Sequence, residues 1–146
     1  MPRTGGWQTA DPDTDCRNAM PDPAHNASLT VELVQAFAHQ MALIDPTWQR
    51  AYLRIAMHSN VPEAKASYVG ATGVEIVDVR AHKPFFHWVT ATATQLRDSL
   101  PAAKPFKVAL VVLSSDLSYE VKYDDEDERR WAISKLNGGT GVPVGH

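Results

Sequence analysis

The fold is decided by the stretch Val108-Ala109-Leu110-Val111-Val112-Leu113-Ser114-Ser115-Asp116-Leu117-Ser118-Tyr119-Glu120-Val121-Lys122-Tyr123. Its first six residues form a continuous apolar run, which is typical of a strand covered on both faces or in the middle of a sheet. Residues 114–116 predict a tight turn, because Ser and Asp side chains hydrogen-bond to nearby backbone groups. Residues 119–123 alternate in polarity and predict a second strand that returns antiparallel to the first.

Three further strands are predicted upstream of this hairpin. Apolar residues alternate with mostly larger or polar ones over 51–58, which predicts a half-buried strand. The inward set is Ala51, Leu53, Ile55 and Met57, and the outward set is Tyr52, Arg54, Ala56 and His58. Two shorter strands are predicted at 65–69 and 74–79, with a turn at 70–73 between them.

Helices are predicted before and after these three strands. Leu33, Phe37, Met41 and Ile44 recur at spacings of four, four and three, so a helix should begin at Ser28 or Thr30 and end at 45–46. A second helix is predicted from 84 to 100, with one apolar face. That face consists of Phe86, Val89, Ala93, Leu96 and Leu100. Trp131, Ile133 and Leu136 predict a short terminal helix that ends at 137–139.

The predicted order of elements is therefore α-β-β-β-α-β-β-α. Because the strands cluster in hairpins, we expect an α+β fold in which an antiparallel sheet of four to five strands carries two main helices on one face. Residues 28–136 should form a single domain. Residues 1–27, which contain four prolines, and residues 137–146 are expected to be flexible tails.

Bulk composition excludes several classes of protein. The chain has 146 residues and a net charge of −3, which fits one domain and argues against a nucleic-acid partner. No stretch approaches the roughly 20 apolar residues that span a bilayer, so no membrane association is expected. The single cysteine, Cys16, cannot form an intramolecular disulfide, and residues 1–6 lack an apolar signal-peptide core. We therefore expect a cytoplasmic protein.

The sequence predicts no catalytic residue, no metal site and no cofactor. The histidines are His25, His39, His58, His82, His87 and His146. His82 and His87 are five residues apart, which is not the i, i+4 spacing of a helical metal pair. Cys16 lies in the predicted tail and could not hold the geometry of a nucleophile. The glycines near the C-terminus follow no strand and precede no helix, so they do not predict a phosphate loop.

Negative charge is concentrated at the end of the predicted hairpin. Residues 116–131 contain seven acidic and three basic side chains, a local net charge of −4. Three interpretations are open. Asp124 and Asp125 could bind a divalent cation, or could perform acid–base chemistry if one of them converged with His58 or His87. Residues 125–128 could instead lie at the start of a helix, where acidic side chains interact favourably with the helix dipole. The third interpretation is a protein-binding face with aromatic anchors among the acids.

The C-terminal third resembles the YezG-like family of bacterial toxin-immunity proteins. The matching residues are Leu117-Ser118-Tyr119-Glu120-Val121-Lys122-Tyr123-Asp124-Asp125 and Glu128-Arg129-Arg130-Trp131. A second match is Pro46-Thr47-Trp48-Gln49-Arg50-Ala51-Tyr52-Leu53, where the family has a Trp just before its first strand. The order of elements also agrees over roughly residues 30–136.

The resemblance implies a non-enzymatic cytoplasmic protein that binds the C-terminal toxic domain of a cognate effector. Many such toxins act on nucleic acids or nucleotides, and an acidic face could occlude a basic active site. A small enzyme or a generic adaptor domain remains the alternative. The residues expected at the interface are Tyr119, Tyr123, Asp124, Asp125, Glu126, Asp127 and Trp131. For Trp131, the sequence favours a second role, in which the ring covers the edge of the sheet, over that of a partner anchor.

Overall fold

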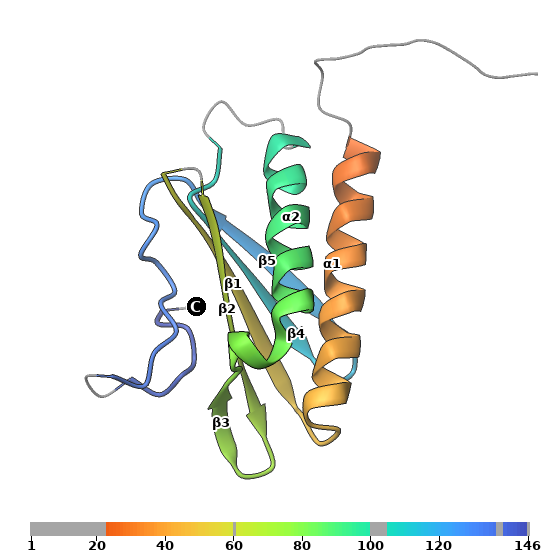
Figure 1. Cartoon of the computed structure of the whole chain (residues 1–146), viewed down its shortest axis with the longest axis vertical. Helices are drawn as coiled ribbons and strands as arrows, with labels where there is room; N and C mark the ends of the chain where they lie inside the picture. The colour runs from red at the N-terminus through yellow and green to blue at the C-terminus, as the bar shows by residue number, and fades with distance from the viewer. Residues whose placement is uncertain (1–22, 60, 100–104, 137–138, 146) are drawn as a thin grey trace, which may run out of the picture.

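A computed structural model describes residues 23–59, 61–99, 105–136 and 139–145, and it shows two helices on a five-stranded antiparallel sheet (Figure 1). The elements are α1 (Pro23–Ile44), β1 (Arg50–His58), β2 (Val61–Gly70), β3 (Gly73–Ile76), a 3-10 helix (Val79–His82), α2 (Lys83–Ser99), β4 (Val108–Ser114) and β5 (Tyr119–Asp124). The sheet order is β3-β2-β1-β4-β5. The predicted α+β class, the antiparallel sheet and the two helices are confirmed.

The main core lies between the two helices and one face of the sheet. Leu33, Phe37 and Met41 of α1 are buried, as their helical spacing predicts. Strand residues at every second position point toward them, because side chains alternate between the faces of a sheet. This set includes Leu53, Ile55, Ala109, Val111 and Leu113.

The opposite face of the sheet is covered by the chain that follows β5. Trp131 and Ile133 pack there against Tyr52, Leu110 and Val112 in a second core, with the partly buried Val142 beside them. In Figure 1 this C-terminal segment lies on the side of the sheet away from α1 and α2. The prediction that the 51–58 strand is half-buried is therefore wrong, since Tyr52 and Ala56 are buried as well.

The predicted terminal helix over 131–136 is not found in the described part of the chain. Trp131 has φ +58°, which is outside the right-handed helical region. Trp131 and Ile133 are two residues apart and enter the same core, as side chains of an extended segment do. The spacing of these residues predicts a helix, but residues 132–134 have no regular secondary structure.

The ends of the domain also differ from the predicted boundaries. α1 begins at Pro23 rather than at Ser28 or Thr30, and proline is well tolerated in a first helical turn. Residues 139–145 were expected to belong to a tail, but the Gly141 N–H donates to the Ser134 carbonyl and the Val144 N–H to the Ala132 carbonyl. The expected tail over 1–22, the expected end of the second helix at 100–101 and residues 137–138 lie outside the described residues.

The β4–β5 hairpin forms as predicted. The Leu117 N–H donates to the Ser114 carbonyl at 2.8 Å, and the Ser114 N–H donates to the Ser118 carbonyl at 2.9 Å. Asp116 Oδ1 accepts from the backbone N–H and the hydroxyl of Ser118. Leu117 takes φ +72°, the left-handed position that closes a three-residue hairpin loop. These bonds set the register in which β5 lies along β4.

Candidate functional site

The acidic segment is an ordered loop organised by Asp124 at the end of β5. Asp124 Oδ1 accepts hydrogen bonds from the Glu126 N–H at 2.8 Å and the Asp127 N–H at 2.9 Å. Its Oδ2 accepts from Arg130 Nη1 at 2.6 Å. The bond from the Asp127 N–H, followed by the one from Arg130, lowers the pKa of Asp124 to about 2. We call residues 124–130 the acidic loop.

Arg54 of β1 fastens the acidic loop to the sheet. Its Nε donates to the Arg130 carbonyl at 2.8 Å, and its Nη2 donates to the Glu128 carbonyl. Burial lowers the pKa of the Arg54 guanidinium, while the nearby Glu63, Asp127 and Glu128 act in the opposite direction. Sequence reasoning missed this residue. The available signal was an arginine in the middle of a mostly apolar strand, between Tyr52 and Ala56 on one face.

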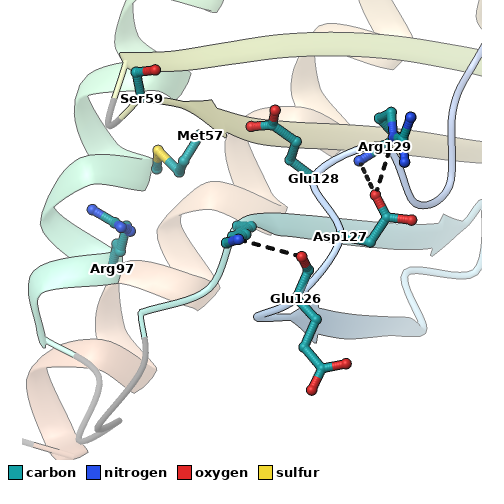
Figure 2. A pocket seen from close by; sticks show the side chains of 8 residues that line it. Met57, Ser59, Arg97, Glu126, Asp127, Glu128 and Arg129 are labelled. Carbon is teal, nitrogen blue, oxygen red and sulfur yellow. Dashed lines mark hydrogen bonds and ion pairs between the residues drawn. The ribbon is translucent and has the colours of Figure 1, made fainter.

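The acids of the loop have different surroundings. Asp125 and Glu126 are exposed, and no basic side chain among the described residues forms an ion pair with either carboxylate. Lys107 Nζ donates to the Glu126 carbonyl at 3.3 Å, and Figure 2 shows the Glu126 carboxylate pointing the other way. Asp127 Oδ1 accepts from the Arg129 N–H at 2.9 Å. The free negative charge of the loop is therefore centred on Asp125 and Glu126.

Glu128 belongs instead to a small cluster around His58 at the end of β1. Its carboxylate lies 3.2 Å from His58 Nδ1, and Glu63 lies 2.7 Å from His58 Nε2. His58 therefore contacts Glu63 and Glu128, and Asp124 is held by Arg130, so the predicted convergence of Asp124 with His58 is not formed.

A cleft of about 600 Å³ runs beside the acidic loop (Figure 2). Its lining residues are Met57, Ser59, Arg97, Lys107, Glu126, Asp127, Glu128 and Arg129. The basic side chains of the cleft already have partners: Arg97 Nε donates to the Phe106 carbonyl, and Arg129 Nε lies 3.5 Å from Asp127. Among the described lining residues, each of the three basic side chains therefore has at least one partner within the protein. Within the described ranges, no group of His, Cys, Asp and Glu side chains could hold a metal ion.

The aromatic residues expected at the interface lie on two different faces. Tyr119 and Tyr123 stand opposite Leu113 and Ala109, so their side chains are on the helix side of β5. Tyr119 and Tyr123 are both exposed, at 46 % and 40 %, and one side of the Tyr123 ring packs against Phe106 with centroids 5.1 Å apart. Burial raises the pKa of the Tyr123 hydroxyl.

Trp131 lies on the other side of the sheet and is 4 % exposed. The Arg130 guanidinium stands over its ring at 4.9 Å, a cation–π contact that closes the second core on that side. This burial confirms the prediction that Trp131 covers the sheet, and it leaves the ring little area to offer a partner.

No family model and no curated protein sequence matches this chain. No helix in the part of the chain that the structure describes is both long enough and apolar enough to cross a membrane.

Proposed function

We propose that this protein is an immunity protein that binds the toxic domain of a cognate bacterial toxin and neutralises it. The observation that carries the proposal is the acidic loop, in which the exposed carboxylates of Asp125 and Glu126 are held on a backbone fixed by Asp124 and Arg54. A fixed loop loses little conformational entropy when it binds, so its charge is available for association. The resemblance to the YezG-like family supplies the class of partner.

The partner surface is expected to be basic. Complementary charge speeds association and disfavours wrong partners more than it adds to final affinity. A toxin domain that acts on nucleic acids or nucleotides needs basic groups in its active site, and the acidic loop would cover them and exclude the substrate. The protein itself performs no catalysis, needs no cofactor and acts in the cytoplasm of the toxin-producing cell.

Co-expression with the C-terminal domain encoded by the neighbouring reading frame tests the class of function. Rescue of growth and co-purification of the two proteins are expected. If the toxic domain kills the cells and no complex can be isolated, the proposed function is wrong.

Charge reversal tests the face. The double variant Asp125→Lys/Glu126→Lys should slow association with the toxic domain by on the order of tenfold at low salt, and the difference should shrink as salt is added. Glu75→Lys/Asp98→Lys is the matched control, because both residues are exposed and neither belongs to the loop or the cleft. Stopped-flow association rates at several ionic strengths give the comparison. Equal effects of the two double variants would show that the acidic loop is not the binding face.

A further inference from the structure

One edge of the sheet is an unpaired strand whose outward backbone groups can be assigned. β5 is hydrogen-bonded only to β4 in the described sheet. The Ser114 N–H donates to the Ser118 carbonyl, and the Lys107 N–H donates to the Asp124 carbonyl, so even-numbered residues of β5 direct their backbone toward β4. Because hydrogen-bonded and non-hydrogen-bonded positions alternate in an antiparallel pair, Tyr119, Val121 and Tyr123 direct theirs outward. Such an edge is a template for another strand.

The sequence of this edge is complementary to itself. Read from either end, Tyr119-Glu120-Val121-Lys122-Tyr123 keeps the same order of residue types apart from the exchange of the acid and the base. We propose that two copies of the chain pair through β5, antiparallel and centred on Val121. Val121 then stands opposite Val121 of the partner subunit, and Tyr119 opposite Tyr123 of the partner subunit. Because the backbone N–H and C=O groups of these residues point away from β4, they can form the hydrogen-bonded pairs between the two copies.

Charge favours this register. Centring on Val121 places Glu120 opposite Lys122 of the partner subunit, and the two-fold axis repeats the contact, so the interface gains two ion pairs. Within the described chain neither Glu120 nor Lys122 is in an ion pair. Opposite charges directly across an antiparallel pair stabilise it, whereas like charges destabilise it. A shift by two residues would lose both contacts.

Apolar surface beside the same edge would be covered by the second copy. A groove of about 300 Å³ lies between α1 and the β4–β5 turn, and Val31, Leu117 and Tyr119 in its wall are 42 %, 62 % and 46 % exposed. Directly opposed residues of a pair face the same side of the sheet, so Tyr123 of the partner subunit arrives next to Tyr119 and the groove. The pairing therefore buries aromatic and aliphatic side chains together with the backbone edge.

The other edge of the sheet carries features that oppose such pairing. β3 pairs with residues 67–70 of β2, and the Val77 N–H donates to the Ala66 carbonyl, so among the described residues only 61–65 lack a backbone partner on that side. This segment contains Pro62, which has no N–H to donate, and the charged residues Glu63 and Lys65. Proline and charges are the usual means by which proteins block edge pairing. The sequence thus protects one edge and leaves β5 self-complementary.

The oligomeric state of the full chain alone, measured by sedimentation equilibrium from micromolar to millimolar concentration, tests the proposal without any toxin. Wild type should dimerise. Glu120→Lys and Lys122→Glu each place like charges at both symmetric contacts and should raise the dissociation constant about tenfold. The charge-swapped double variant Glu120→Lys/Lys122→Glu restores the ion pairs and should recover wild-type dimerisation. Lys65→Glu, on the other edge, is the matched control and should change nothing.

Val121→Pro tests the backbone contacts. It removes an N–H that points away from β4, so the monomer should keep its circular-dichroism spectrum while the dimer is lost. If that variant fails to fold, the charge-swap series still tests whether the dimer forms through β5. A wild-type chain that stays monomeric over the whole range, or a dimer whose stability ignores the charge-swap series, would overturn the proposal. Failure here leaves toxin binding by the acidic loop unaffected, since that is measured as a separate complex.

Discussion

The carboxylate of Asp124 stabilises the acidic loop and is not itself presented to a partner. It lies within an acidic run, but its two oxygens accept from two backbone N–H groups and from Arg130. Its side chain is only 13 % exposed, so it has little left to offer a partner. Its role is to set the direction of the loop, and the neighbouring Asp125 and Glu126 present the charge.

The stability of the protein should therefore depend on the ionisation of Asp124. Its folded-state pKa of about 2 lies below the ordinary value of 3.8. A lowered pKa gives stability that is complete above the ordinary value and is lost as pH falls through about 2. Asp124→Asn removes this contribution, so the variant should be less stable than wild type at neutral pH and should approach it as pH falls.

Urea unfolding of both proteins between pH 7 and about pH 2 measures the difference directly, because the other carboxyl groups titrate in both chains. Asp125→Asn is the control, since its exposed carboxylate makes no hydrogen bond or ion pair among the described residues. A constant gap between wild type and Asp124→Asn across the pH range would contradict the assignment.

At the scale of the element, the acidic loop depends on Arg54. The two carbonyl groups that it binds, on Glu128 and Arg130, flank the last turn of the loop before Trp131. Arg54→Met keeps most of the side-chain volume and removes both hydrogen bonds. Because bonds to a charged donor contribute roughly 1.5–3 kcal/mol, we expect a loss of about 2 kcal/mol in the free energy of unfolding.

Hydrogen exchange distinguishes loss of the loop from general loosening. In Arg54→Met the amides of residues 126–130 should exchange faster, while those of α2 keep their protection relative to the new global stability. Arg54→Lys is the conservative comparison, since one ammonium group cannot reproduce a fork that reaches two carbonyls. If the loop amides are protected equally in all three proteins, Arg54 does not hold the loop.

Local patterns predicted the two helices and the burial of residues 108–113 on both faces of the sheet, but they did not predict the segment that covers the second face. The helical spacing of Leu33, Phe37 and Met41 and the apolar run at 108–113 were sufficient, because packing against a helix preserves a simple period. The burial of Tyr52 was not predictable from its own strand, since the residues that cover it follow β5, far along the chain.

The candidate site was located only in part by sequence reasoning. Charge density identified the loop and its free acids, since charge is a local property. The clamp by Arg54 is a contact across 74 and 76 residues of sequence, and no local pattern reports it. Aromatic residues near the acids were grouped by their proximity in sequence, but the alternation of β5 and the turn after it place Tyr119 and Trp131 on opposite faces.

At the scale of the whole molecule, the sheet is the middle of three layers, with the helices on one face and the C-terminal segment on the other (Figure 1). Trp131 is the largest side chain of that third layer, and its positive φ is a conformation that a bulky residue adopts only when its surroundings require it. Its burial against Tyr52 and Leu110 supplies that requirement.

Trp131→Ala should therefore lower the free energy of unfolding of the protein, and its effect should not be limited to binding. Truncation of a buried Trp costs about 3–5 kcal/mol, so chemical unfolding should show a loss in that range. Trp88→Ala is the matched control, because Trp88 lies on α2 with 37 % of its surface exposed and should cost far less. If Trp131 were instead an anchor for the toxin, Trp131→Ala would leave the unfolding transition unchanged and weaken the complex. That outcome would show that Trp131 belongs to the binding face and that it does not stabilise the second core.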